Sequence, residues 1–499
     1  MKILKSIIAA AAVIGLGAVN TSCSDWLDYT PKDKQTYDQQ FATQAGFHST
    51  ANGIYTQMSG SNLYGYNLSY GPIDVMASMY NVPSANTSMY EYYNGTWTGQ
   101  YASAGFKSIW TTAYNTLLNI NVLLEALDEK SEGVLIPDDQ KLMKGEMLAL
   151  RAMIHLDLVR LFGPRYNSPT GLTVPYAETA EIIRRDRLPL NEIIHDYIIR
   201  DLNEAEKLLK DVDPVLTEGV QVGDGGEEGN WWRYRQLRMN YYAVCLLKAR
   251  AYMWMNEKAE ALAEALKITD DANAKNAFPW VDATRLLGNG SNPDRIFSSE
   301  CLFGFYNNKL SNIFDYHFVG SLDPAIVLQT RKNYLDILFV NSTDYRRQTQ
   351  WTSSASSVAD YDFCKYKGFK VNANTPEFWG LFFGLMRKSE AYLIAAEALL
   401  DTDQAAALTY LNELRKARGI EDMADSSTKA AILKQIKFEY LRDMRGEGQI
   451  YFMFKRHYQV FGQYYGGDNQ FDGGGASLDF ETPSTNVRYT VPIPADETY

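Results

Sequence analysis

The sequence predicts a mainly α-helical protein, in which helical hairpins form a scaffold for long irregular loop insertions and a few short strands. Three observations support this fold class. Segments with apolar residues three and four positions apart recur along the chain, two alanine-rich segments have the spacing of tight helix–turn–helix units, and long stretches rich in glycine, asparagine, serine and aromatic residues separate the helical segments. With 499 residues, 46% of them hydrophobic, the chain can bury a large core.

The amphipathic segments are expected to form helices in chain order. They span residues 106–127, 140–162, 190–209, 237–255, 258–268, 385–400 and 405–417. Two tight hairpins are predicted, one turning near Asn256 and the other at residues 401–403. Alanines in both hairpins allow the two helices to approach closely, and this pattern is typical of tetratricopeptide-like repeats.

Between the helices, four stretches have a different composition. They are rich in glycine, asparagine, serine, tyrosine and tryptophan and lie near residues 59–100, 212–233, 278–376 and 464–499. We expect loops and short strands there. Together they exceed a hundred residues, and long ordered loops on a rigid scaffold are where binding sites usually lie.

The first residues resemble the leader of an exported lipoprotein. Lys2 and Lys5 precede a short apolar run over residues 7–19, which is too short to span a bilayer, and Cys23 follows small polar residues. We expect residues 1–22 to be a signal peptide, Cys23 to be lipidated, and residues 23–499 to form one domain. The alternative is cleavage near Ala18, which would leave Cys23 an ordinary thiol. No other apolar stretch reaches the roughly 20 residues of a membrane span, so attachment would be by lipid alone.

The charge balance and the cysteine positions argue against a nucleic-acid partner, a disulfide framework and a zinc site. Forty-eight basic against 60 acidic residues give a net charge of −12 without a long basic run, which argues against nucleic acid as a partner. Cys245, Cys301 and Cys364 are widely spaced and form no CxxC pair, so neither a disulfide framework nor a zinc site is expected.

Catalytic motifs are absent from the sequence. It contains no HExxH, GxSxG or GxxxxGK[ST] pattern, so no catalytic residues, metal or cofactor are predicted. Asp468, Asn469 and Asp472 lack the rest of an EF-hand loop and fit a solvated turn better than a calcium site. Two carboxylates flanking a cleft would suffice for a glycoside hydrolase, which remains the less favoured alternative.

A sugar site needs flat aromatic faces and amide groups, and two segments offer both. In the run YEYYNGTWTGQY, Tyr92, Asn94 and Trp97 are the candidate ligand contacts, with Trp97 either an exposed platform or a ring tucked under the surface. A second candidate group combines Tyr306, Asn307 and Trp351 in the long insertion.

Several longer motifs carry a family resemblance. They are SDWLDYTPKDK after Cys23, EMLALRAMIHLDLVRLFGP, KSEAYLIAAEALL, LNELRKARGI, RDMRGEGQIYFMFKR and YTVPIPADE. Jointly they resemble the SusD/RagB starch-utilisation-type lipoproteins of the Bacteroidetes outer membrane. The resemblance implies a non-enzymatic, lipid-anchored cell-surface protein that captures oligosaccharides and delivers them to a TonB-dependent, SusC-like β-barrel transporter. A peptide ligand in the same uptake architecture is the alternative.

Overall fold

The computed structural model describes residues 36–288, 293–318, 323, 326–355, 358–367, 378–457 and 489–494. Cys23, the leader, the 468–472 segment and most of the predicted 464–499 insertion lie outside these residues. None of the described helices is long and apolar enough to cross a bilayer.

The predicted mainly helical fold is confirmed. The helices that build the scaffold are α3 (Gln44–Met58), α6 (Gln100–Glu129), α7 (Pro137–Phe162), α9 (Arg200–Lys210), α11 (Tyr241–Trp254), α12 (Lys258–Thr269), α18 (Lys388–Leu399), α19 (Gln404–Ala417), α20 (Lys429–Asp443) and α21 (Ile450–His457). Shorter helices are α2 (Tyr37–Gln40), α4 (Pro72–Met76), α5 (Thr87–Asn94), α8 (Leu190–Glu192), α10 (Gly226–Gly229), α13 (Ala272–Ala277), α14 (Ala283–Leu287), α15 (Leu310–Phe318), α16 (Lys332–Leu338) and α17 (Tyr345–Thr349).

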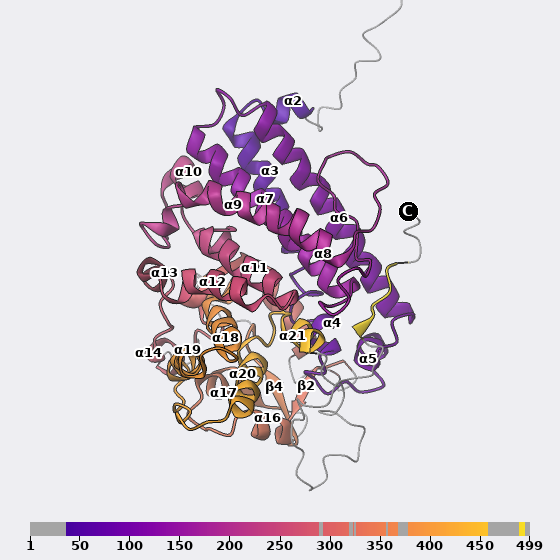
Figure 1. Ribbon diagram of the computed structural model, residues 1–499. Helices are drawn as coiled ribbons and strands as arrows, with labels where there is room; N and C mark the ends of the chain where they lie inside the picture. Colours follow the sequence, from indigo (N-terminus) through magenta and orange to yellow (C-terminus); the bar gives the residue numbers. More distant parts are fainter. Residues whose placement is uncertain are drawn as a thin grey trace, which may run out of the picture.

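The long helices pack against one another largely in chain order (Figure 1). α6 packs on α7, α7 on α9, α9 on α11, α11 on α12, α12 on α18, and α18 on both α19 and α20. The hairpin between α11 and α12 turns at Asn256, whose φ of 61° is left-handed, a conformation that asparagine tolerates better than most residues. Asp403 caps the start of α19, where its side chain accepts a hydrogen bond from the Ala406 amide. Both predicted hairpin turns are therefore confirmed.

α7 lies at the centre of the helical layer. Pro137 opens it and Asp138 and Asp139 occupy its first turn, where the missing proline N–H and the acidic charges both suit a helix start. From Gly145 to Phe162 every residue is buried, because α6, α9 and α11 cover it. Such a helix is surrounded on all sides and shows no amphipathic contrast.

The predicted insertions contain more helix than expected. The 59–100 stretch includes α4 and α5, and the 278–376 stretch includes α14 to α17 as well as strands. The strands are β1 (Cys301–Tyr306), β2 (Gln329–Arg331), β3 (Trp351–Ser353), β4 (Asp360–Phe363) and β5 (Phe382–Arg387). β1 pairs antiparallel with β5, and β4 lies between β2 and β3 in a second antiparallel sheet.

One predicted helix begins in the wrong place. Residues 385–387 were expected to open the helix that ends near residue 400, but they belong to β5, and α18 starts at Lys388. All six residues of β5 are buried, so the apolar run lacks the alternation that distinguishes a strand from a buried helix.

Candidate functional site

The predicted platform Trp97 is buried. Its exposed fraction is 8%, and its ring meets the Phe106 ring of α6 edge-on, with centroids 5.7 Å apart. Gly95 ends α5 with a left-handed φ of 74°. In the short segment before α6, Thr96 and Thr98 are exposed and the Trp97 side chain between them is buried. The interpretation of Trp97 as an exposed platform is therefore wrong, and the alternative of a tucked, loop-anchoring ring describes its position.

Tyr92 and Asn94 also serve the packing of α5. The Tyr92 ring is buried edge-on against Phe106, and its hydroxyl donates to the Tyr101 carbonyl at 3.1 Å. That hydroxyl fills the space that a Cβ on Gly105 would need, so only glycine allows this approach. Asn94 is half-buried as the last residue of α5.

The second predicted group is divided by the structure. Tyr306, at the end of β1, is 48% exposed, whereas Trp351 is 5% exposed and lies between the Phe363 ring and the Arg445 guanidinium. An exposed Trp351 is therefore a wrong expectation, because this ring forms core beneath the three-stranded sheet. Asn307 donates from Nδ2 to the Ser59 carbonyl at 3.0 Å, which fixes the end of β1 to the 59–71 loop.

The 59–71 loop brings the two predicted segments together. Besides the Asn307–Ser59 hydrogen bond, Tyr66 of this loop stacks on His317 of α15, with centroids 4.7 Å apart, and its hydroxyl contacts Met89 of α5. The elements that carry residues 90–101 and 306–318 therefore meet across one loop.

Tyr316 is the most exposed ring at this meeting point, with 58% of its surface accessible. It meets His317 edge-on at 4.8 Å, and His317 in turn stacks on Tyr66. Burial lowers the pKa of His317 to about 4, so the ring is neutral near pH 7. We call Tyr101, Tyr306 and Tyr316, the exposed tyrosines of these elements, the aromatic surface.

Sequence reasoning missed Tyr316, although a signal was present. Leu310, Phe314 and Phe318 recur every four residues and are buried, which defines the inward face of α15. Tyr316 falls two residues from Phe314 and Phe318 and must therefore face away from the core.

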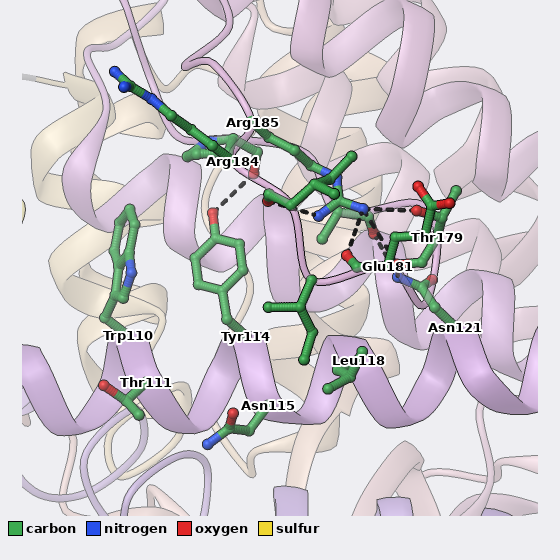
Figure 2. Close-up of a pocket in the computed structure, with 14 residues that line it drawn as sticks. Trp110, Thr111, Tyr114, Asn115, Leu118, Asn121, Thr179, Glu181, Arg184 and Arg185 are labelled. Atoms are coloured by element: carbon green, nitrogen blue, oxygen red, sulfur yellow. Dashed lines mark hydrogen bonds between the residues drawn. The ribbon is translucent and has the colours of Figure 1, made fainter. Parts of the chain in front are cut away.

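A pocket of about 530 Å³ lies between α6 and the 163–189 connection. Figure 2 shows Trp110, Tyr114 and Leu118 rising from one face of α6 toward the segment that carries Thr179, Glu181, Arg184 and Arg185. The rings of Trp110 and Tyr114 lie 4.9 Å apart. Trp110 is buried and also forms part of the pocket wall.

Side chains from α6 and α7 hold the wall segment 175–180 by its backbone. The hydrogen bonds are Tyr114 Oη to the Pro175 carbonyl at 2.8 Å, Asn121 Nδ2 to the carbonyls of Ala177 and Thr179 at 3.0 Å each, Arg151 to the Glu178 carbonyl at 3.1 Å, and the Ala180 amide to Glu125 at 2.8 Å. His155 accepts from the Ala177 amide at 3.0 Å. Because buried backbone groups need partners, these side chains determine the path of the loop.

One cluster has metal-ligating residue types. Glu206, Cys245 and Glu264 place one ligand atom each within 4.8 Å of one another. Lys248 and Lys267 already contact both carboxylates at 2.5–2.8 Å, and burial raises the pKa of the Cys245 thiol. Two ammonium groups and a protonated thiol disfavour a cation, so the arrangement is better explained as a buried ion-pair cluster.

Two family models match this chain. Residues 297–499 match the model of the SusD family, and residues 25–218 match a model described as starch-binding associating with outer membrane. No curated protein matches.

Solved structures from Bacteroides share the fold. A SusD superfamily protein from Bacteroides thetaiotaomicron is 19% identical with a TM-score of 0.68, covering 91% of this chain and 97% of its own. A SusD-like carbohydrate binding protein from Bacteroides vulgatus is 19% identical with a TM-score of 0.64, covering 84% of each chain. Surface glycan-binding protein A from Bacteroides thetaiotaomicron is 16% identical with a TM-score of 0.63, covering 93% of this chain and 97% of its own. With two family models matched over most of its length, the chain belongs to the SusD/RagB family.

Proposed function

We propose that this protein is a cell-surface binding protein that captures oligosaccharides and delivers them to a TonB-dependent outer-membrane transporter. Family membership supports the binding role, as do the names of two structural neighbours, a SusD-like carbohydrate binding protein and a surface glycan-binding protein. The family description associating with outer membrane supports the location.

The observation that carries the proposal is the aromatic surface. Tyr316 is exposed yet held in place through its edge contact with His317, and a ring fixed before binding loses little entropy when a sugar stacks on it. Pyranose rings present C–H-rich faces to such a ring. Of the six residues predicted from the sequence, Tyr306 remains a proposed contact, and Asn94 lies on the neighbouring α5.

Tyr316→Ala tests the site. Titration calorimetry against neutral oligosaccharides, such as maltoheptaose and xylohexaose, should show an affinity loss of about tenfold or more, equivalent to about 1.4 kcal/mol or more. Tyr37→Ala is the matched control, because Tyr37 is an exposed tyrosine on α2 whose hydroxyl contacts Glu129. Equal affinity of the Tyr316 variant and the native protein would place the ligand elsewhere.

The rival ligand is a peptide. A peptide site relies on backbone hydrogen bonds and apolar pockets and tolerates varied side chains, whereas stacking on one ring gives a steep dependence on that ring. A glycan panel that gives no heat, together with a peptide library that binds, would overturn the oligosaccharide proposal.

We further propose that binding occurs without turnover. Purified protein incubated with the glycans it binds should generate no new reducing ends. Their appearance would favour the glycoside hydrolase alternative.

Attachment and partner follow from the family role. Acylation of Cys23 should be visible by mass spectrometry of the native protein and absent from Cys23→Ala. A β-barrel transporter should co-purify with the protein from detergent-solubilised membranes. Recovery of the protein without any such transporter would contradict delivery to this partner.

A further inference from the structure

The pocket between α6 and the 163–189 connection combines two kinds of wall. Its floor is apolar and aromatic, formed by Trp110, Tyr114 and Leu118 on α6. Its rim is the 181–185 segment, in which Ile182 is 90% exposed. A volume of about 530 Å³ is within the range of about 300–1,000 Å³ typical of small-molecule sites.

The rim carries an excess of positive charge. Two arginines, Arg184 and Arg185, and one acid, Glu181, line the pocket, in a chain whose net charge is −12. Arg185 is oriented by Thr179, to whose hydroxyl it donates at 2.7 Å. Arg184 is exposed, and Figure 2 shows its side chain extending above the Trp110 and Tyr114 rings. Among the ion pairs of the described residues, none involves either arginine.

Two other arginines near this pocket form ion pairs. Arg151 pairs with Asp201 at 2.6 Å and Arg200 pairs with Glu178 at 3.0 Å. Arg184 and Arg185, by contrast, form no ion pair with a carboxylate among the described residues. A planar guanidinium matches a carboxylate in a bidentate arrangement, and this pairing is stronger than a neutral hydrogen bond.

The pocket is formed before any ligand arrives. Tyr114 cannot swing away, because its hydroxyl is bonded to the Pro175 carbonyl, and the opposite wall is fixed at residues 175–180 by the side chains of α6 and α7. A connection of this length without helix or strand is uncommon unless it has a function. Preorganisation reduces the entropic cost of binding.

We propose that this pocket binds an acidic sugar, a uronic acid residue of an oligosaccharide, with Arg184 contacting the carboxylate and Tyr114 contacting the pyranose face. The inference rests on the proposed function, because it names a class of glycan for a protein of this kind. Thr111 and Asn115 of α6 also line the pocket and supply hydroxyl and amide groups for sugar hydroxyls.

Trigalacturonic acid and its methyl ester are the test ligands, because they differ in charge and share the sugar backbone. In titration calorimetry the acid should bind at least tenfold more tightly than the ester. Arg184→Gln should remove that preference while leaving the weak affinity for the ester unchanged. Raising the salt concentration should weaken binding of the acid and not of the ester.

Arg331→Gln is the control variant, since Arg331 is an exposed arginine at the junction of β2 and α16, and Figure 1 shows these two elements well below α6. It should retain the native preference for the acid. Equal affinity for acid and ester, or an acid preference that survives Arg184→Gln, overturns the inference. So does an acid preference that is abolished by Tyr316→Ala and not by Arg184→Gln, since the acid would then bind at the aromatic surface.

The two proposals fail separately. Neutral oligosaccharides that depend on Tyr316, together with no discrimination between acid and ester, would contradict the acidic pocket alone. Binding of peptides without any oligosaccharide would contradict the oligosaccharide proposal itself. Tighter binding of a sulfated trisaccharide than of trigalacturonic acid would assign the pocket to a different anion. That result would overturn the proposal that the ligand is a uronic acid.

Discussion

Asp443 is surrounded by three buried arginines at the end of α20. Its carboxylate lies 2.7 Å from Arg418, 2.8 Å from Arg387 and 3.0 Å from Arg346, and it accepts from Ser389 at 2.6 Å. Burial alone would raise the pKa of Asp443, but the three guanidinium groups outweigh it and hold that pKa well below its usual range.

Asp443→Asn should strongly destabilise the fold. The variant keeps the shape of the side chain and removes the charge that balances three arginines in a solvent-free site, so the free energy of unfolding should fall by about 3–5 kcal/mol. Urea titration monitored by circular dichroism measures the loss. Asp425→Asn, at an exposed aspartate, should change stability by less than about 0.5 kcal/mol. Similar stability of the two variants would show that the cluster is not balanced as described.

His155 is a second residue whose protonation state is fixed by geometry. Its Nδ1 contacts the Arg151 carbonyl at 2.8 Å and its Nε2 accepts from the Ala177 amide at 3.0 Å, which requires the neutral ring. Burial lowers the pKa of His155 to about 3. The unfolded chain, with a histidine pKa near 6.5, takes up the proton first as pH falls. Stability that is fully present above about pH 6.5 is therefore lost on acidification toward pH 3.

The expected loss from His155 is about 1.4 kcal/mol per pH unit below pH 6.5, or about 2 kcal/mol at pH 5. Denaturant titrations at pH 7 and pH 5 should show a smaller pH dependence for His155→Gln than for the native protein. His48, His317 and His457 also have lowered pKa values and are present in both proteins, so the difference isolates His155. Identical pH dependence would mean that His155 is protonated in the fold.

At the scale of elements, α21 closes the end of α7. Lys455 of α21 donates from Nζ to the carbonyls of Arg160, Leu161 and Gly163 at 2.8–3.0 Å, so one buried ammonium satisfies three acceptors at a helix C-terminus. Burial lowers the pKa of Lys455 to about 7, and in its protonated form the charge also complements the helix dipole.

Lys455→Met should leave those carbonyls without a donor. At about 1–3 kcal/mol for each unsatisfied buried group, partly relieved by entering water, the variant should lose about 3 kcal/mol or more of stability. Thermal unfolding followed by calorimetry checks this, with Lys434→Met on the exposed side of α20 as the control. A melting temperature close to that of the control would show that water replaces the ammonium at little cost.

The helices and strands differ in how well the sequence predicts them. α6, α12 and α19 have polar and apolar sides, and periodicity located α12 and α19 to within one residue at each end. The predicted start of α6 lies six residues after the observed one. β5 was taken for the start of a helix, because both of its faces are buried. α3 is absent from the predicted helices, although its buried residues recur three and four positions apart, because its glycines at positions 46 and 53 are unfavourable inside a helix.

The candidate sites were less predictable than the scaffold. Composition located the aromatic segments, but whether a ring points outward depends on partners far along the chain. Trp97 turns inward onto Phe106, and Trp351 lies over Arg445. The pocket joins Tyr114 to Pro175, 61 residues apart, and no local pattern predicts that contact.

For the molecule as a whole, the two regions that match family models share one core. α11 lies between these two regions in the sequence, and it packs against α7 and α9 of the first region and against α18 of the second. Arg250 of α11 binds Glu390 of α18 through two buried hydrogen bonds of 2.8 and 2.5 Å. Nearly all buried apolar residues from Phe41 to Val491 belong to one contiguous cluster. We therefore propose that residues 36–494 unfold as a unit, in line with the single domain expected for residues 23–499.

A single cooperative transition is the expected outcome of unfolding the protein. Calorimetry should give one peak, and the loss of helix seen by circular dichroism should coincide with the change in tryptophan fluorescence, because Trp110 and Trp254 lie in the same core as α18. Glu390→Gln leaves the Arg250 charge buried without its carboxylate, so it should lower the temperature of that one transition by several degrees. If the interface between α11 and α18 instead joined two independent domains, the variant would split the peak. One half would then melt at its original temperature, and that result would contradict the single domain.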